Sequence, residues 1–440
     1  MAEQSQVGQV NAERKPFVVL MAGVAGSGKT TLGRALAARL GLPILDLDTL
    51  TNPLLDALSD VLPGEHWLTG PHAPVIRSGR YAVLREAAAE ITALGLSAVL
   101  VAPFTAELRG GTEWAELVAA VAPATVVVVH VDGSPALLAA RRAERGAARD
   151  AFRPADAVGT VTGFGAGSGA EVGDAVPAGA TVARGGAPVI PHLRIEAALA
   201  TEQQLQRVLR ELGVREPVDT SSTLLEATFD AVLFDLDGTL LDSTGAVLRS
   251  WETLAAEYGF SAQAVQENHG RPAGALIRAV VAPGRVAEAA ARIQQLEVED
   301  VDGITPIAGA LDLLAALPPG AKAVVTSGTR AIATARMAAA GIPAPDVVIT
   351  ADDVTNPKPD PEPFLRAAAL LGVDPARCLV VEDAPAGVTA ARAAGCLVLG
   401  VGGTTPREAL PADLWVDALD RVRIVPRPDG GFGLALAPLR

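Results

Sequence analysis

The chain has 440 residues, of which half are hydrophobic, a fifth are charged and only 3% are aromatic, and its formal net charge is −14. This length and composition predict two or three folded domains with cores of Ala, Val and Leu, and they exclude a disordered chain. The acidic balance disfavours nonspecific binding to nucleic acid or to an anionic membrane, so a phosphorylated substrate would need local positive groups.

The cysteines and the N-terminal residues bear on the cellular compartment. The first fifteen residues are polar and lack an apolar signal core, and no apolar run approaches the roughly 20 residues that span a bilayer. Cys378 and Cys396 lie in apolar segments and are expected to be two buried thiols, with a disulfide left open. We therefore expect a cytoplasmic protein.

Residues 16–213 are predicted to form a first α/β domain, because strand-like apolar runs alternate with Ala- and Leu-rich helical stretches. The strands are predicted at 17–23, 42–48, 97–104 and 124–133. Residues 155–190 are rich in Gly, Ala and Val without a sustained period, and we interpret them as a long insertion. A last strand and helix are predicted over 192–213, with a capping box formed by Thr201 and Gln204.

Residues 214–228 are predicted to be a linker, and a second α/β domain is predicted over 229–425. Its strands are predicted at 231–237, 321–328, 346–350, 378–383 and 396–402. Residues 244–310 interrupt the alternation with mostly helical sequence, and we interpret them as a cap inserted over the sheet edge. The fold class is therefore α/β, with two doubly wound parallel-sheet domains.

The stretch GVAGSGKT (23–30) matches the phosphate-binding loop G-x-x-x-x-G-K-[ST] in full, between a predicted strand and a predicted helix. Its glycines let backbone N–H groups turn inward around phosphates, and the helix N-terminus adds a partial positive charge. Lys29 is expected to reach the β- and γ-phosphates of ATP, and Thr30 to hold Mg²⁺. The predicted ATP-binding residues are Gly23, Gly26, Ser27, Gly28, Lys29, Thr30 and Thr31.

This region resembles the small-molecule kinases of the P-loop superfamily, the group that contains gluconate and shikimate kinases. The resemblance implies that Asp48 and Arg80 bind the substrate and that Arg142 is a lid arginine over the nucleotide. Ala102, however, ends the third strand where many relatives carry an acidic residue for Mg²⁺ and water. Two alternatives stay open: a kinase for a small molecule, or a catalytically silent nucleotide-binding regulator.

In the second domain four polar stretches each follow a predicted strand. The first, DLDGTL, places Asp235 and Asp237 on one side of an extended chain, because side chains repeat with a period of two. One carboxylate there can attack phosphorus, and the other can protonate the leaving oxygen and then activate water. The other three stretches are VVTSGTR (324–330), NPKPDPEPF (356–364) and VVEDAPAG (380–387).

These three stretches offer groups that bind phosphate and metal. Hydroxyl and N–H donors suit phosphate oxygens, a lysine supplies positive charge, and carboxylates suit Mg²⁺. The phosphate contacts are predicted to come from Thr326, Ser327, Gly328 and Lys358, and the metal contacts from Glu382 and Asp383 together with Asp235.

Together the four motifs resemble the haloacid dehalogenase superfamily of phosphatases over residues 229–425, with a Rossmann-like core. The resemblance implies that Asp235 is the nucleophile that forms an aspartyl-phosphate and that Asp237 is the acid/base. Thr326 or Ser327 with Lys358 would then clamp the phosphate. The metal set that we predict is Asp235, Asp237, Glu382 and Asp383 in this domain, with Thr30 in the first.

The position of the cap indicates the subclass with a small helical cap, and the flanking stretches resemble sugar and glycerol-phosphate phosphatases. His269 and Arg271 would then face the substrate from the cap, although a structural role for His269 is equally open. Val247 stands where phosphomutase relatives carry a catalytic histidine, which favours hydrolysis. We predict an Mg²⁺-dependent phosphatase of small sugar or polyol phosphates, fused to an ATP-binding kinase-like domain; the sequence names neither the sugar nor the oligomeric state.

Overall fold

The protein is described here from a computed structural model, over residues 15–59, 67, 71–146, 188–260, 273–428 and 430–437. The chain divides into two compact units, Met1–Ala197 and Ala198–Arg440, and each contains a parallel sheet covered by helices. Most of the predicted insertion, and both His269 and Arg271 of the cap, lie outside the described residues. None of the described helices is both long and apolar enough to cross a membrane.

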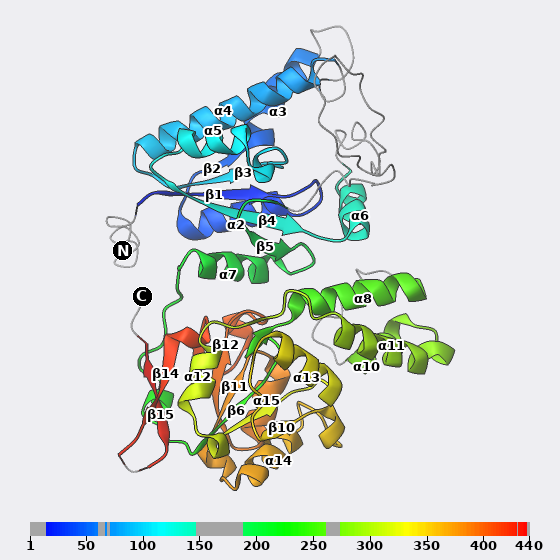
Figure 1. The fold of residues 1–440 in the computed structure, drawn as a ribbon, viewed down its shortest axis with the longest axis vertical. Helices are drawn as coiled ribbons and strands as arrows, with labels where there is room; N and C mark the ends of the chain where they lie inside the picture. Colours follow the sequence, from blue (N-terminus) through cyan, green and yellow to red (C-terminus); the bar gives the residue numbers. More distant parts are fainter. Residues whose placement is uncertain are drawn as a thin grey trace, which may run out of the picture. The chain divides into compact units, whose positions relative to one another are not determined.

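The first unit is built on a five-stranded parallel sheet with the order β2-β3-β1-β4-β5 (Figure 1). Its strands are β1 (Phe17–Ala22), β2 (Ile44–Asp46), β3 (Ala98–Val101), β4 (Thr125–Asp132) and β5 (Leu193–Glu196). Every predicted strand of this domain is present, although β2 and β3 are shorter than expected. The central strand β1 is almost fully buried, as its run of apolar residues predicts.

Helices cover both faces of this sheet. They are α2 (Lys29–Leu40), α3 (Leu47–Ser59), α4 (Ala73–Ala93), α5 (Thr112–Ala120) and α6 (Pro135–Arg145). Val18 and Leu20 of β1 belong to the core cluster of α4 and α5, whereas Met21 lies against α2 at Gly33. Alternate residues of one strand therefore face the two helical layers, as the pleat requires, and Figure 1 shows these layers on opposite faces.

The second unit is built on a six-stranded parallel sheet with the order β10-β9-β6-β11-β12-β13. Its strands are β6 (Ala231–Phe234), β9 (Lys322–Val325), β10 (Val347–Ile349), β11 (Cys378–Glu382), β12 (Leu397–Val401) and β13 (Leu414–Val416). Strand β6 has β9 on one side and β11 on the other, so the carboxyl ends of three motif-bearing strands adjoin. Cys378 and Cys396 are free and buried, as predicted.

Helices also cover both faces of the second sheet. Helices α12 (Ala310–Ala316) and α13 (Arg330–Ala339) pack on one face, and α14 (Glu362–Leu371) and α15 (Pro385–Ala393) pack on the other. An antiparallel hairpin, β14 (Val422–Pro426) and β15 (Phe432–Leu436), adds to the first of these layers and runs past the predicted end at 425. The short 3-10 helices are η1 (Glu107–Arg109), η3 (Thr223–Leu225), η4 (Pro283–Arg285), η5 (Pro319–Ala321), η6 (Ala351–Asp353), η7 (Pro375–Arg377), η8 (Arg407–Ala409) and η9 (Leu419–Arg421).

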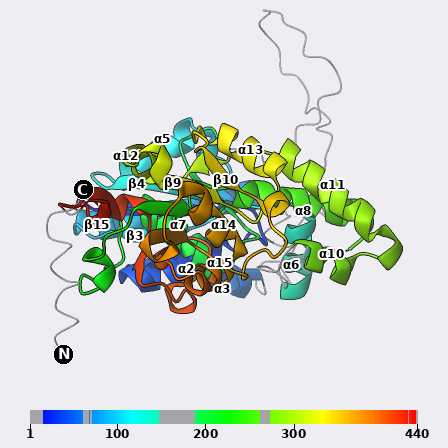
Figure 2. The same cartoon turned by 90° about the horizontal axis from the view of Figure 1, so that it is seen from below.

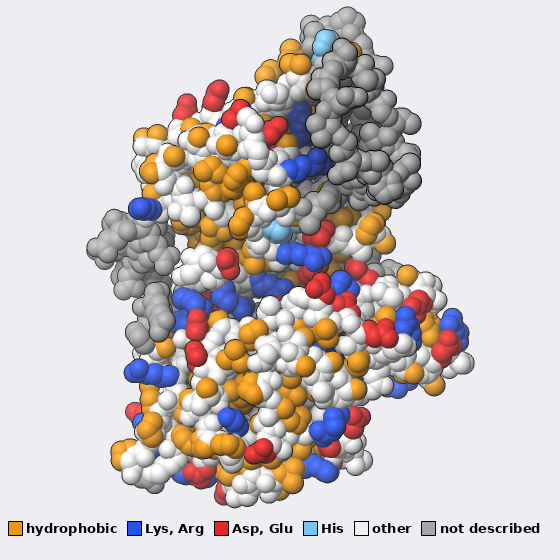
Figure 3. All heavy atoms as spheres, viewed as in Figure 1, with side chains coloured by type: hydrophobic (Ala, Val, Ile, Leu, Met, Phe, Trp, Pro, Cys, Tyr) orange, Lys and Arg blue, Asp and Glu red, His pale blue; other side chains and the backbone are white. Residues whose placement is uncertain are grey.

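The predicted cap is helical and has a core of its own. It contains α8 (Thr244–Tyr258), α10 (Ala273–Val280) and α11 (Val286–Glu299), and its base is the antiparallel pair β7 (Leu241–Asp242) and β8 (Thr305–Pro306). Its three helices lie together at one side of the second unit in Figures 1 and 2. Their apolar faces share a cluster around Trp251, Leu254 and Ile293, while acidic and basic side chains alternate outside (Figure 3).

Helix α7 (Thr201–Glu211) differs from its prediction in two ways. It belongs to the second compact unit, whereas the predicted boundary lies at 213. The predicted capping box is also replaced by half of one, a residue earlier: Ala200 takes the N-cap position and its N–H donates to Gln203 Oε1 at 3.2 Å, but its methyl side chain caps no N–H group. Gln204 is instead buried and donates to the Leu199 carbonyl at 3.1 Å.

Candidate active site

The structure brings the predicted catalytic residues of the second unit together at the carboxyl edge of its sheet. Asp235 directly follows β6, Thr326 directly follows β9, and Glu382 ends β11. Because these strands are parallel neighbours in register, their polar ends adjoin. The Asp235 N–H donates to the Val381 carbonyl at 2.9 Å, which fixes the backbone at the first of these carboxylates.

Lys358 is the cationic centre of this site. Its side chain is 5% exposed, and its ammonium donates to Asp235 Oδ1 at 2.6 Å, to Glu382 Oε1 at 2.7 Å and to the Val325 carbonyl at 2.9 Å. All three N–H donors of the ammonium are thereby used. The lysine motif and the aspartate motif therefore lie together, and the predicted contact of Lys358 with a phosphoryl group stays a prediction.

Electrostatics leave this cluster short of positive charge. Burial raises the pKa of Asp235 well above its usual range, and the neighbouring carboxylates add to the rise against the pull of Lys358. Burial and then the charge of Glu382 raise the pKa of Asp383 to about 7. For Lys358, burial alone would lower the pKa, but the charges of Asp235 and Glu382 outweigh it and raise the pKa. Three buried carboxylates thus share one ammonium.

The shortage of positive charge fits a bound cation. Ligand oxygens of Asp235, Glu382 and Asp383 all lie within 4.8 Å of one another, and all three residues are buried. Carboxylate oxygens at such spacing suit a hard divalent cation such as Mg²⁺, whose charge would favour their ionised forms. The described residues therefore fit the predicted metal, and the Asp383 carboxylate is also oriented by the Thr239 hydroxyl, which donates to its Oδ1 at 3.2 Å.

Glu382 is held by other groups. Its Oε1 accepts from Lys358, and its Oε2 accepts from the N–H groups of Asp383 and Ala384, both at 2.8 Å. The helix behind it must carry glycine, since a Cβ on Gly387 would lie 1.5 Å from Glu382 Oε1. These contacts orient Lys358 and the following turn, and Glu382 is also one of the three clustered carboxylates, so its predicted role as a metal ligand stays a prediction.

The predicted acid/base, Asp237, has two partners that the sequence did not reveal. Ser243 donates from its hydroxyl to Asp237 Oδ1 at 2.6 Å, and Arg336 of α13 donates to the same oxygen at 2.7 Å. Arg336 also contacts Glu297 Oε2 of cap helix α11 at 3.2 Å, and its side chain is 5% exposed. Asp237 is not among the three residues whose ligand atoms cluster, although the prediction placed it in the metal set.

The phosphate-clamp residues follow β9 in a tight turn. Thr326 is buried and its hydroxyl accepts from the Gly328 N–H at 3.1 Å, whereas Ser327 is exposed. Thr326 and Lys358 are linked through the same strand end, because the Lys358 ammonium bonds the carbonyl of Val325. The site thus places hydroxyl, N–H and ammonium donors beside the carboxylate of Asp235.

The phosphate-binding loop of the first unit has the backbone that the motif predicts. Gly23, Gly26 and Gly28 have positive φ angles of 139°, 87° and 93°, a region that side chains with a Cβ rarely adopt. Helix α2 begins at Lys29, directly after Gly28, so the loop precedes a helix N-terminus. The Lys29 ammonium donates to the Val24 carbonyl at 3.4 Å.

Helix α6 packs against this loop through the predicted lid arginine. Arg142 donates to the Ala25 carbonyl at 3.3 Å, and a Cβ on Gly26 would lie 2.5 Å from the carbonyl oxygen of Leu138. Gly26 is therefore required both for its φ angle and for this close approach. Arg142 therefore contacts a backbone carbonyl of the loop in this structure. Its predicted role as a lid arginine over the nucleotide stays a prediction.

The predicted substrate residues of the first unit pair with each other. Asp48 lies in the first turn of α3 and not at a strand end, because β2 stops at Asp46, whose carboxylate caps the helix by accepting from two backbone N–H groups. Arg80 of α4 donates to Asp48 Oδ1 at 2.7 Å and also to Thr51 and Asn52.

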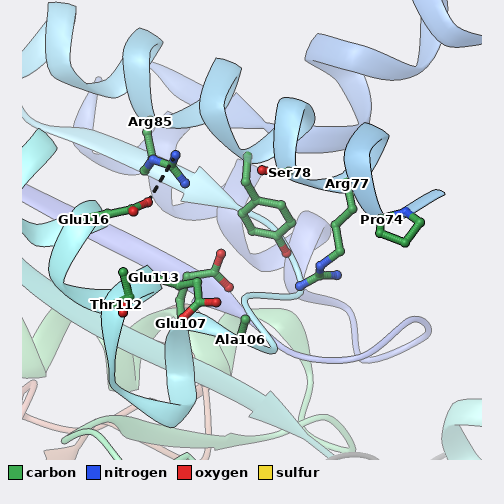
Figure 4. Close-up of a pocket in the computed structure, with 10 residues that line it drawn as sticks. Pro74, Arg77, Ser78, Arg85, Ala106, Glu107, Thr112, Glu113 and Glu116 are labelled. Atoms are coloured by element: carbon green, nitrogen blue, oxygen red, sulfur yellow. Dashed lines mark ion pairs between the residues drawn. The ribbon is translucent and has the colours of Figure 1, made fainter. Parts of the chain in front are cut away.

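A polar pocket of about 280 Å³ lies between α4 and α5 in the first unit (Figure 4). Arg77 and Tyr81 of α4 line it, and in Figure 4 the Glu107 and Glu113 side chains lie across it from Arg77. Burial raises the pKa of Glu107, and one of its oxygens has no hydrogen-bond partner among the described residues. No residue of the phosphate-binding loop lines this pocket, so it is separate from the predicted nucleotide site.

The chain belongs to the haloacid dehalogenase-like hydrolases, whose family model matches residues 229–395. Residues 18–161 match the AAA domain model AAA_33, which is consistent with a P-loop, kinase-like nucleotide-binding domain. Each match lies within one of the two units and contains the residues of the site predicted there.

Several relatives of this chain are named as phosphatases or phosphohydrolases. Hexitol phosphatase A of Escherichia coli is 40% identical over 205 residues, covering 45% of this chain and 95% of that protein. Glycerol-1-phosphate phosphohydrolase 2 of Saccharomyces cerevisiae is 36% identical over 200 residues, covering 41% of this chain and 77% of the relative. Among solved structures, CbbY of Rhodobacter sphaeroides in complex with phosphate is 25% identical, with a TM-score of 0.39 over 44% of this chain and 95% of that one.

Proposed function

We propose that this protein is an Mg²⁺-dependent phosphatase of small sugar or polyol phosphates that works through an aspartyl-phosphate on Asp235. The observation that carries the proposal is the buried cluster in which one ammonium, that of Lys358, bonds both Asp235 and Glu382, and in which Asp383 is a third carboxyl group beside them. The names of the relatives, which act on hexitol phosphates and glycerol phosphate, support this substrate class.

The residues divide the chemistry between them. Asp235 Oδ1 is bonded to Lys358, which leaves Oδ2 to attack phosphorus while the bond from phosphorus to the sugar oxygen breaks. Asp237 gives its proton to the departing oxygen, and later takes one from the water that cleaves the aspartyl-phosphate into inorganic phosphate and free Asp235. The Thr326 hydroxyl donates to a phosphoryl oxygen, whereas Lys358 and the Gly328 N–H reach the phosphoryl group by exchanging their present acceptors, the Val325 carbonyl and the Thr326 hydroxyl oxygen, for phosphate. Mg²⁺, when bound by Asp235 and Asp383, would neutralise the charge of the transferring group.

Phosphate release from a panel of sugar and polyol monophosphates, with Mg²⁺ and with a chelator, tests the proposal. Asp235→Asn should abolish release from every member of the panel. Asp237→Asn should lose hydrolysis of sugar phosphates but still be phosphorylated by p-nitrophenyl phosphate, because p-nitrophenolate leaves without a proton. Full activity in Asp235→Asn would refute the nucleophile assignment.

For the first unit we propose ATP binding at the phosphate-binding loop and transfer to a small molecule, with a silent regulatory role as the second candidate. Ala102 at the end of β3 and the engagement of Asp46 as a helix cap favour the second candidate, because neither supplies a free acidic group. ATP consumption with a sugar panel in the Asp235→Asn protein separates the two. Turnover that needs both a sugar and Lys29 supports a kinase, and ATP binding without turnover supports the regulator.

Two opposed activities on one substrate would only hydrolyse ATP, so we propose that the two units act on different substrates or positions. The substrate profile of the Asp235→Asn protein as a kinase, compared with that of the Lys29→Met protein as a phosphatase, tests this. A shared best sugar would refute it.

A further inference from the structure

Helix α7 lies in the chain before the residues that match the hydrolase family, yet it hydrogen-bonds two loops of the phosphatase site. The family match begins at residue 229, whereas α7 spans Thr201–Glu211. Both α7 and the loops belong to the second compact unit, so these contacts lie within one body. Neither contact is predicted by the motifs, because each joins residues that are distant in sequence.

The first contact is an ion pair at the base of the cap. Arg207 donates to Asp242 at 2.7 Å, and the two side chains are 17% and 35% exposed. Asp242 also accepts from the Thr244 N–H at 3.1 Å, so its carboxylate closes the turn that carries Ser243. Ser243 in turn donates to the acid/base Asp237 at 2.6 Å. Arg207 thus fixes the turn that orients Asp237.

The second contact lies on the metal side of the site. Gln203 Nε2 donates to the Thr404 carbonyl at 2.7 Å, while its Oε1 accepts from the Ala200 N–H, so both ends of the amide are held. The Thr404 side chain hydrogen-bonds Asp383, the carboxylate with surplus charge in the metal cluster. Gln203 thus fixes the loop that supports Asp383. Because the amide oxygen and the amide nitrogen of Gln203 are both hydrogen-bonded, the orientation of this half-buried side chain is fixed.

We propose that Gln203 and Arg207 of α7 are positioning residues of the phosphatase, Arg207 for the proton-transfer group and Gln203 for the metal-binding carboxylate. The proposal rests on the phosphatase function proposed above. Gln203 acts through Thr404, and Arg207 acts through Asp242 and Ser243, so substitution should loosen the site without removing a group that touches the substrate. Loss of a residue that orients a metal ligand typically costs about tenfold to a hundredfold in metal affinity or activity, and we expect the lower end here because each contact is indirect.

The kinetic test uses the full chain and three variants of α7. Arg207→Gln should lower kcat about threefold to tenfold with little change in KM, because it acts on proton transfer. Gln203→Ala should raise the Mg²⁺ concentration for half-maximal activity by a similar factor. Gln206→Ala is the matched control, since the Gln206 amide bonds Glu202 within the same helix at 2.8 Å and should change neither quantity.

A charge swap separates positioning from general damage to the fold. Arg207→Asp alone should be at least as impaired as Arg207→Gln, and Arg207→Asp combined with Asp242→Arg should recover part of the lost kcat, because the ion pair is restored in reverse. Recovery in the double variant is not expected from a merely structural role at either position. If Arg207→Gln and Gln203→Ala both behave like Gln206→Ala, the proposal is overturned.

Hydrogen exchange gives a readout that does not need activity. Amides over 237–243 and 402–405 should exchange faster in Arg207→Gln and Gln203→Ala respectively, and unchanged exchange in both would refute the positioning role. If the native chain hydrolyses no sugar phosphate, the proposed function fails, but the exchange experiment still decides whether α7 holds the two loops.

Discussion

The two predicted phosphate-binding sites of this chain differ in the chemical groups that form them. In the second unit the site consists of buried, charged side chains, with Lys358 bonded at once to two carboxylates and a carbonyl. In the first unit it consists mainly of backbone, with three glycines at positive φ before a helix N-terminus. A site of buried side chains holds full charges that need neighbouring countercharges, whereas a site of backbone N–H groups offers mainly partial charges.

This difference predicts how each site responds to substitution. Removal of a charge from the second unit should damage stability and activity together, because a buried partner is left unpaired. Removal of a charge from the first unit should affect ligand binding and leave the fold intact. The four predictions below follow from this contrast, in order of falling effect.

Lys358→Met should have the largest effect. It leaves Asp235 and Glu382 buried without their cation, which should cost about 3–5 kcal/mol of unfolding free energy, and it removes a phosphate donor, which should lower kcat about a hundredfold to a thousandfold. Urea denaturation and phosphate release measure the two. Lys322→Met is the matched control, because the half-buried Lys322 ammonium donates to the carbonyls of Leu314 and Leu317 at 2.7 and 2.8 Å, at the start of β9. Unaltered stability of Lys358→Met would contradict the contrast.

Lys29→Met should weaken ATP binding about tenfold to a hundredfold, as expected for loss of one charge-assisted hydrogen-bond donor. The free energy of unfolding should stay within about 0.5 kcal/mol, because Lys29 is half-buried and near a helix start. Calorimetric titration with ATP and thermal unfolding measure the two. Arg34→Met, at an exposed position of the same helix, should change neither. A large loss of unfolding free energy in Lys29→Met would contradict the contrast, because the site of the first unit would then depend on a buried charge, as we expect for the site of the second unit.

Arg336→Met should lower kcat about tenfold, because Asp237 loses a partner at 2.7 Å and the cap loses its link through Glu297. Burial raises the pKa of Glu297, and removal of the Arg336 charge should raise it further. Arg336→Lys should recover only part of the rate, since an ammonium cannot reproduce a guanidinium that bridges two carboxylates. Arg330→Met, at the exposed start of the same helix, is the control; equal kinetics in both variants would exclude a role for Arg336.

The smallest effect concerns pH and Mg²⁺. The pKa of Asp383 is raised from 3.8 to about 7 in the folded protein. Without metal, the Asp383 carboxyl is therefore protonated in the folded state and ionised in the unfolded state at a pH between these two values. Stability from this group therefore falls as pH rises from about 4 to about 7. Mg²⁺ needs the ionised carboxylate, so its stabilising shift of Tm should grow by a few degrees between about pH 5.5 and pH 8.

Asp383→Asn should abolish this pH-dependent part of the Tm shift, whereas Asp312→Asn, at an exposed position of α12, should retain it. A Tm shift by Mg²⁺ that is independent of pH in the native chain would contradict the raised pKa.

The sequence predicted the elements whose residues carry a local signal. Apolar runs located every strand of the two parallel sheets except β13, and the motifs at their carboxyl ends located Asp235, Thr326 and Glu382, because parallel strands deliver their ends to one edge. The glycines of the phosphate-binding loop carried their own signal, since their spacing is tied to backbone geometry.

The residues that the sequence missed act through contacts distant along the chain. Arg336 lies in an Ala-rich helix with no motif around it, and only the packing of α13 beside β6 brings it to Asp237. Asp48 was misplaced because Asp46 ends the strand and caps a helix, which period-two reasoning over 42–48 does not distinguish from a longer strand. Such contacts depend on tertiary structure, so they produce no periodicity or motif spacing in the sequence from which they could be predicted.

The helix that precedes the hydrolase match also bears on modularity. Recombination and domain transplantation use boundaries that families define, and here such a boundary would fall at residue 229. A fragment cut there would retain every motif residue of the phosphatase and lose the hydrogen bonds from Gln203 to Thr404 and from Arg207 to Asp242. A fragment that keeps these contacts must therefore begin before residue 229, where the family match begins, and include the helix that starts at Thr201.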